Sequence, residues 1–91
     1  MQFEWDALKA AGSLAKHGVS FDEASTVFGD PFAGTIAAPL HSMDGMRFVT
    51  MGSSASRRLL VVVQADRGQA IRIISARRTT RRETIRYESK T

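Results

Sequence analysis

The 91-residue sequence contains no cysteine, only two prolines and no long apolar run. The absence of cysteine excludes a disulfide framework, a zinc ribbon and a thiol nucleophile. The longest unbroken aliphatic segment, residues 59–63, is five residues long, whereas a helix that spans a membrane needs about 20. The first residues show no basic segment followed by an apolar stretch, so we expect no secretory signal and a cytoplasmic location.

Acidic residues are scarce at the C-terminal end, where positive charge is concentrated. Residues 1–66 hold five basic and seven acidic side chains, whereas residues 67–91 hold eight basic and two acidic ones. Ten of the 13 basic residues are arginine, whose planar guanidinium forms paired hydrogen bonds with phosphate and stacks on bases. This asymmetry indicates either a surface for nucleic acid or another anionic partner, or a solvated basic helix without a ligand.

Two N-terminal helices are predicted from capping residues and from apolar residues at helical spacing. Asp6 is a suitable N-cap and Gly18 a suitable stop for a first helix that runs to about residue 16. Ser20 and Glu23 have the spacing of a capping box for a second helix, which ends at Gly29. The apolar stripe of the first helix consists of Leu8, Ala11, Leu14 and Ala15.

After Pro31 the period of the apolar residues changes from 3.6 to 2, which predicts strands. Strands are expected at 32–37, 47–51, 58–65 and 70–77, with a first strand at 2–5 and a loop at 39–45. Residues 59–63 are apolar at every position, so we expect the central strand there. Thr80 and Glu83 have the spacing of a second capping box, which predicts a closing helix to about residue 89.

The predicted fold is a single α+β domain, residues 1–91, with the order βααββββα. A small antiparallel sheet packs against two N-terminal helices and one C-terminal helix. We take Arg67 and Gly68 as the tight turn between the last two strands. The resulting register places these residues on the face toward the helices: Phe48, Leu60, Val62, Ile71 and Ile73. It places these residues on the opposite face: Arg47, Arg72 and Arg78, around Val49, Val61 and Ile74.

The sequence has no phosphate-binding glycine loop, dinucleotide fingerprint or nucleophile elbow. The two histidines, His17 and His41, are 24 residues apart and have no second metal ligand nearby, so we expect neither a metal nor a cofactor. Arginines can stabilise the charge that develops when the 2′-hydroxyl of RNA attacks the adjacent phosphate. Trp5 is suited to stacking on a base or, equally, to a place in the core.

Several sequence blocks occur in the order known from one protein family. The blocks are Phe-Glu-Trp-Asp at 3–6, Lys-His-Gly-Val-Ser-Phe at 16–21, Val-Phe-Gly-Asp-Pro at 27–31, Arg-Phe-Val-Thr-Met-Gly at 47–52, Leu-Leu-Val-Val-Val at 59–63, Ile-Arg-Ile-Ile-Ser-Ala-Arg at 71–77 and Thr-Arg-Arg-Glu at 80–83. Over nearly its whole length the chain resembles the BrnT toxins of type II toxin–antitoxin systems. The resemblance implies a RelE-like fold and a metal-independent ribonuclease that inhibits translation. It also implies neutralisation by a BrnA-type ribbon–helix–helix antitoxin, through which the complex would bind operator DNA.

The resemblance also implies the residues of the active site. It assigns catalytic roles to Trp5, Arg47 and Arg77. This chain has Met46 where a glutamate is implied, and Ser53 where an arginine is implied. Arg57 or Arg58, in the same turn as Ser53, would then supply the missing guanidinium.

Other residues are expected to bind RNA or the antitoxin. The expected RNA-binding residues are Arg57, Arg58, Arg72, Arg78 and Tyr87. The expected antitoxin-binding residues, on the closing helix, are Arg82, Ile85 and Arg86. Two alternatives remain open: a toxin-like protein with weak or no catalysis that represses with its antitoxin, and a basic RNA-binding module without a toxin role.

Overall fold

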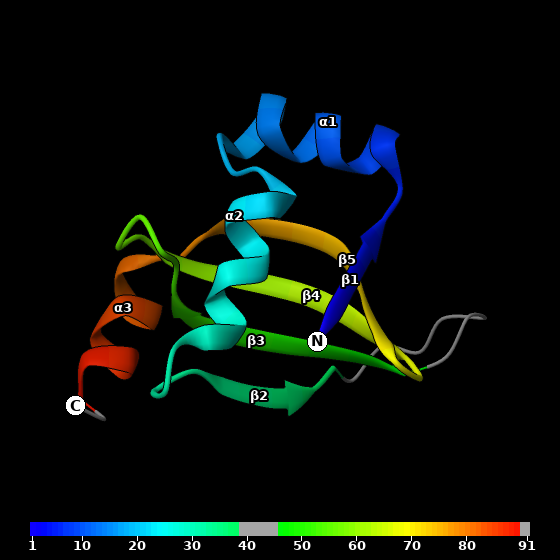
Figure 1. The fold of residues 1–91 in the computed structure, drawn as a ribbon. Helices are drawn as coiled ribbons and strands as arrows, with labels where there is room; N and C mark the ends of the chain where they lie inside the picture. The colour runs from blue at the N-terminus through cyan, green and yellow to red at the C-terminus, as the bar shows by residue number, and fades with distance from the viewer. Residues whose placement is uncertain (39–45, 90–91) are drawn as a thin grey trace.

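The computed structural model describes residues 1–38 and 46–89, and Figure 1 shows helical segments across one face of a sheet. The helical elements are α1 (Ala7–His17), α2 (Phe21–Ser25), the 3₁₀ helix η1 (Thr26–Gly29) and α3 (Arg81–Glu88). The strands are β1 (Gln2–Trp5), β2 (Gly34–Ala37), β3 (Arg47–Ser53), β4 (Leu59–Arg67) and β5 (Ala70–Arg78). The predicted order holds, with one difference: the second predicted helix is divided into α2 and η1. The predicted loop at 39–45 lies outside the described residues.

The five strands form one mixed sheet in the order β1-β5-β4-β3-β2. The prediction that β4 is the central strand is confirmed. The prediction of an antiparallel sheet is right for β2 to β5 but wrong for β1, which pairs with β5 in parallel. After β1 the chain passes through the helices and then reverses direction three times between β2 and β5. The apolar pattern of a strand is the same in both directions, so it does not predict whether β1 and β5 pair in parallel.

None of the helices in the described ranges is long and apolar enough to cross a bilayer.

The turn between β4 and β5 lies one residue further along the chain than predicted. Arg67 is paired with Ala70, so Gly68 and Gln69 form the turn, and Gly68 has a left-handed φ of 72° that favours glycine. The pairing is also interrupted between residues 63 and 64, where a β-bulge leaves Ile74 without a register partner.

The bulge decides which side chains of β5 share a face. Beyond it, Val61 is paired with Arg77 and Leu60 with Arg78. Arg77 therefore shares a face with Val61, and the predicted placement of Arg78 on that face is wrong. Ile74 has no register partner, so the pairing does not test its predicted placement. A single unpaired residue reverses the side of the sheet on which every later residue of the strand lies.

One face of the sheet packs against α1, α2 and η1. The core comprises Val19, Phe21, Ala24, Val27, Leu60, Val62, Ile73 and Ala76. The five residues predicted to face the helices do lie on this face. The predicted pairing of β3 with β4, and of β4 with β5 before the bulge, is shifted from the observed pairing by an even number of residues. Such a shift leaves every side chain on its predicted face. We call the opposite side the open face; it carries Arg47, Val49, Met51, Val61, Arg72 and Arg77.

An ion pair joins α2 to the β3–β4 turn. The side chain of Ser20 accepts a hydrogen bond from the Glu23 backbone, as predicted, but the Glu23 carboxylate does not complete the capping box. It accepts hydrogen bonds from Nε of Arg58, at 2.9 Å, and from the hydroxyl of Ser54, at 2.7 Å. The hydrogen bond from Arg58 is the main cause that lowers the pKa of Glu23. Arg58 is thus a structural residue as well as a basic one.

Helix α3 has no buried residue and is held at the end of the sheet by polar contacts. The Tyr87 hydroxyl donates a hydrogen bond to Oδ2 of Asp30 at 2.6 Å, and the same oxygen accepts one from the Ser53 backbone at 2.7 Å. The hydrogen bond to Asp30 raises the pKa of Tyr87 to about 12. Asp30 therefore connects α3 to the end of β3.

Gly52 lies where η1 and the loop after it approach β3 most closely. A Cβ atom at this position would lie 2.8 Å from Cβ of Ala33 and 3.0 Å from Cγ1 of Val27. We expect Gly52→Ala to lower the free energy of unfolding by about 1–3 kcal/mol, because the contact atoms are not flexible side-chain ends. Gly12→Ala is the matched control: nothing lies within 4 Å of its Cβ position, and alanine favours a helix by about 1 kcal/mol. Urea unfolding of both variants measures the difference; equal stability of the two would contradict the packing argument.

The tyrosine contact can be tested directly, because Tyr87 is the only tyrosine. A raised pKa stabilises the folded protein fully below pH about 10, the ordinary pKa, and this contribution is lost as the pH rises toward about 12. We expect tyrosinate absorbance in the folded protein to appear well above pH 10. In Asp30→Asn, the transition is expected to move toward the ordinary value. A transition near pH 10 in both folded proteins would show that the hydrogen bond is absent.

Candidate active site

The most specific polar arrangement on the open face is the pair formed by Arg77 and Glu83. Arg77 is the penultimate residue of β5, and Glu83 lies in the first turn of α3. Nη1 and Nη2 of Arg77 donate to Oε1 and Oε2 of Glu83, each at 2.9 Å. Nη1 also donates to the backbone carbonyl of Arg78 at 3.1 Å. These contacts fix the plane of the guanidinium.

The capping box of α3 sets the position of Glu83. The Glu83 backbone donates to the Thr80 hydroxyl, and the Thr80 backbone donates to Oε1 of Glu83 at 2.8 Å, so the predicted box is complete. The hydrogen bonds from Arg77 lower the pKa of Glu83 to about 2. Glu83 is therefore ionised at every physiological pH. It is a weak base there, and its main effect is to hold Arg77.

A pocket of about 240 Å³ lies beside this pair, between β2, β3, β4 and α3. Its lining residues are Gly34, Thr35, Ile36, Val49, Met51, Val61, Glu83 and Arg86. The walls from the sheet are apolar, whereas α3 supplies one carboxylate and one guanidinium. The pocket thus combines an apolar surface with a charged rim, which suits a ligand that has both a flat apolar part and an anionic part.

Arg47 and Arg72 lie at the other end of the open face. Both are paired with Ala65, whereas Arg77 is paired with Val61. Four residues along β4 correspond to about 13 Å, so Arg47 and Arg77 are too far apart to hold a single phosphate. Arg72 also donates to Glu4 at 3.0 Å. These arginines can contact one extended anionic strand only at separate points.

Trp5 does not lie with Arg47 and Arg77. It packs against the core on the face that the helices cover, with its ring in edge contact with Phe21 at a centroid distance of 5.9 Å. The sheet separates it from the open face. The structure therefore brings Arg47 and Arg77 to one face and leaves Trp5 on the other, in the core position that was the alternative expectation.

A second basic group lies at the end of the sheet, on the side of α2. One pocket of about 530 Å³ is lined by the adjacent residues Arg57 and Arg58 and by Arg78, which is 20 residues further along the chain, together with Leu59, Thr79 and Thr84. Arg58 is engaged by Glu23 and also donates to the carbonyl of Gly18 at 2.9 Å. Arg57 is exposed and has a φ of 64°. Three of the expected RNA-binding residues are thus brought together, with one of them held in an ion pair.

The remaining predicted residues have mixed surroundings. The hydroxyl of Tyr87 is engaged by Asp30, so a role in binding RNA would have to use its ring. The three residues expected to meet the antitoxin, Arg82, Ile85 and Arg86, are exposed on α3. Ser53 lies at the end of β3 beside Asp30, and Met46 is 51% exposed just before β3.

Sequence reasoning missed Glu83 and the place of Arg86 beside the pocket. Glu83 was identified as a capping residue, and its second role depends on Arg77 lying on the open face. That placement follows from the bulge, which the sequence pattern does not show. Within residues 1–38 and 46–89, no group of three or more metal-ligating side chains is found.

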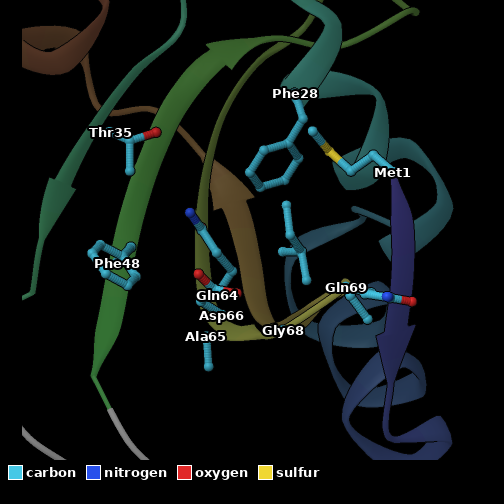
Figure 2. A pocket seen from close by; sticks show the side chains of 11 residues that line it. Met1, Phe28, Thr35, Phe48, Gln64, Ala65, Asp66, Gly68 and Gln69 are labelled. Carbon is cyan, nitrogen blue, oxygen red and sulfur yellow. The ribbon is translucent and has the colours of Figure 1, made fainter.

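A further hollow lies on the helix-covered side, near the N-terminus, and Figure 2 shows its lining. It has a volume of about 470 Å³ and includes Phe28, Phe48 and Gln64. The amide of Gln64 donates to the hydroxyl of Thr50 at 2.6 Å, and its buried Oε1 has no hydrogen-bond partner in the described residues. No arginine lines this hollow, so it is not part of the arginine site.

Comparison with known proteins identifies the family. The family model described as the ribonuclease toxin BrnT of type II toxin–antitoxin systems matches residues 5–83. One similar solved structure is the ribonuclease toxin BrnT of Brucella abortus, with a TM-score of 0.65 and 21% identity, covering 89% of this chain and 99% of that chain. No match is found among curated proteins. The arginine-rich open face thus lies on the fold of a known toxin, and the chain belongs to the BrnT family of ribonuclease toxins of type II toxin–antitoxin systems.

Proposed function

We propose that this protein cleaves RNA on its open face without a metal ion, and that it thereby inhibits translation in the cytoplasm. The observation that carries the proposal is the position of Arg77, oriented by Glu83 at the edge of an apolar pocket in a chain of the BrnT family. A guanidinium fixed in this way is preorganised, so it can stabilise charge that develops nearby without reorganising first.

The reaction that fits is attack of a 2′-hydroxyl on the adjacent phosphate, which gives a cyclic phosphate and a free 5′-hydroxyl. The phosphorane in the transition state carries additional negative charge on its equatorial oxygens. A guanidinium has five N–H donors, and the three described hydrogen bonds of Arg77 leave two of them for these oxygens. Glu83 acts as a positioning residue, because it orients Arg77 and its pKa is too low for an effective general base.

The other arginines would hold the RNA strand across the sheet. Arg47 and Arg72 lie about 13 Å from Arg77 along β4, where they can contact a neighbouring part of the same strand. Arg86 lies beside the pocket at the active end. Arg57 and Arg78 extend positive charge around the end of the sheet. The proposed RNA strand would therefore run along the whole open face and turn at the end of the sheet where the β3–β4 turn lies.

A weakly active or inactive toxin remains the second candidate. It is favoured by Met46, which cannot take a proton, and by Ser53, which cannot neutralise a phosphate. The Ser53 backbone is held by Asp30, and the nearest basic group in the same turn that is not in an ion pair with Glu23 is Arg57. Cleavage of RNA by the purified chain distinguishes the two candidates.

The central prediction concerns Arg77. We expect Arg77→Ala to lower the rate of RNA cleavage by about 10²-fold or more, the typical loss for one preorganised donor of charge stabilisation. Glu83→Gln is expected to lower the rate less, because the arginine remains but is no longer held by an ionised partner. Arg81→Ala, at the exposed first residue of α3, is the matched control and should keep full activity.

The measurement is single-turnover cleavage of an end-labelled RNA, with and without EDTA, and circular dichroism to verify folding. Cleavage that persists in EDTA supports the metal-independent route. A folded Arg77→Ala protein that cleaves as fast as the parent would overturn the assignment. A parent protein that does not cleave, while still binding its antitoxin, would favour the second candidate.

We also propose that a BrnA-type ribbon–helix–helix antitoxin neutralises the toxin by covering α3, and that the complex reaches operator DNA only through the antitoxin. On α3, Arg82, Ile85 and Arg86 are exposed, and Arg86 lines the pocket beside Glu83. An acidic segment that binds these residues would also cover the active end of the open face. This arrangement accounts for inhibition by direct masking.

Reversing the charge of α3 tests this docking. We expect Arg82→Glu with Arg86→Glu to weaken antitoxin binding and to make the affinity less dependent on salt. Salt weakens exposed ion pairs, because the Debye length falls from about 10 Å at 0.1 M as salt is added, and the double variant no longer forms these pairs. Arg57→Glu with Arg67→Glu carries the same change of net charge at two exposed turns and serves as control. Calorimetric titration at several salt concentrations gives both quantities. Equal affinities of the two double variants would reject the docking on α3.

A further inference from the structure

Helix α1 turns its leucines to the solvent and a serine to the core, the reverse of a usual amphipathic helix. The apolar side of a surface helix ordinarily faces the core. Here Leu8 is 83% exposed and Leu14 is 54% exposed, whereas the only buried residue of the helix is Ser13. The Ser13 hydroxyl lies 3.1 Å from the carbonyl oxygen of Val19 and 3.0 Å from that of Ala76. A small polar residue thus docks the helix on the sheet, and the leucines point to water.

The helical spacing gathers the exposed apolar residues into one surface. Successive residues of an α-helix are about 100° apart. With Ser13 toward the sheet, these residues fall on the outer half of the helix: Ala7, Leu8, Ala11, Gly12, Leu14 and Ala15. We call this the α1 apolar face. All of its members are exposed, and none is charged.

Positive charge lies along one border of the α1 apolar face. Lys9 and Lys16 are seven residues apart, which places them in one row, and both line a shallow hollow with Ile74 and Ser75 of β5. No acidic side chain occurs in the first turn of α1, and none of residues 7–17 is acidic. Both lysines lie on the side of α1 toward β5, next to the Gly12 edge of the α1 apolar face, so a partner that covers this face and extends past that edge also meets a row of two cations.

We propose that the α1 apolar face is a second docking site for the antitoxin, and that it binds an apolar helix of the antitoxin bordered by acidic residues. This inference rests on the proposed function, in which a protein antitoxin exists. The small residues at positions 7, 11 and 15 follow the i+4 row of the helix and allow another helix to approach closely. The two leucines on either side of that row supply the apolar contact area.

A second copy of this chain is the other conceivable occupant, and charge argues against it. The net charge of each copy is +4. Antiparallel pairing of two α1 helices would bring both lysine rows to the same side of the interface, where they repel. The face is one helix of 11 residues, about 16 Å long, which is far from the roughly 800 Å² per partner in a stable dimer. An acidic partner removes the repulsion, and contacts on α3 add the missing area.

Two separate docking sites would give the antitoxin distinct tasks on the toxin. The segment on α3 masks the active end of the open face, whereas the helix on α1 contributes affinity without touching that face. Linked contacts reinforce each other, because the first to bind raises the effective concentration of the second. Loss of the α1 contact should therefore release the antitoxin and leave the catalytic face unchanged.

The test uses the full chain and, as probe, the protein encoded by the gene immediately downstream. We expect Leu8→Gln with Leu14→Gln to weaken binding of the probe by about 100-fold, the effect of removing two well-placed apolar contacts. Lys9→Glu with Lys16→Glu should weaken binding more at low salt than at high salt. Phe32→Gln is the control: it removes an apolar side chain that is 53% exposed near the far edge of the sheet, and should bind like the parent.

Folding and activity are measured on the same proteins. Since both leucines are exposed, the double variant should keep the melting temperature of the parent and its rate of RNA cleavage. A folded Leu8→Gln, Leu14→Gln protein that binds the probe as tightly as the parent overturns the α1 assignment and leaves the proposed function intact. A parent chain that does not bind the probe overturns the antitoxin proposal and the α1 assignment together.

Sedimentation of the chain alone decides between the two occupants. We expect a monomer at concentrations where the complex with the probe is fully formed. A dimer that dissociates on Leu8→Gln with Leu14→Gln would make the second copy the occupant and would overturn the proposal.

Discussion

The ion pair between Arg77 and Glu83 is the contact on which the open face depends. It attaches α3 to β5 and orients the guanidinium, and Glu83 lines the pocket. Helix α3 buries no residue of its own, and this pair and the hydrogen bond from Tyr87 to Asp30 both attach it to the rest of the domain. Partly exposed ion pairs contribute little free energy, since water and salt screen them. The end of the sheet that carries the proposed active site is therefore held by contacts for which an anionic ligand can compete.

The β-bulge in the pairing of β4 with β5 has a comparable influence on function. If the register found before the bulge continued, Arg78 would be paired with Leu59 on the open face, and Arg77 would be paired with Leu60 on the side of α2. With it, the two neighbouring arginines are divided: Arg77 joins Glu83 on the open face, and Arg78 joins Arg57 in the second basic group. One unpaired residue thus gives the chain two separate basic surfaces from one short Arg-Arg sequence.

The sequence predicts most of this fold because caps and periodicity are local properties. Asp6, Ser20 and Thr80 begin helices as expected, and the apolar segment of β4 is central. The register around the bulge and the direction of β1 depend on pairing between distant segments, which no local pattern records. The spatial arrangement of the candidate site was not predicted: Trp5 packs against the core, and the sequence identified Glu83 only as a capping residue.

The reversed amphipathicity of α1 follows from how closely this helix must approach the sheet. The single hydroxyl proton of Ser13 lies within reach of two backbone carbonyls at the contact and can be donated to either, whereas a leucine there would offer no donor. Leu8 and Leu14 are consequently exposed to solvent. The domain of 91 residues therefore buries less apolar surface when it folds without a partner, and its folded state is less stable for that reason. Any partner that covers these leucines stabilises the folded state by mass action. With the proposed docking of the antitoxin on α1, stability and neutralisation would be coupled, because binding would stabilise the folded chain.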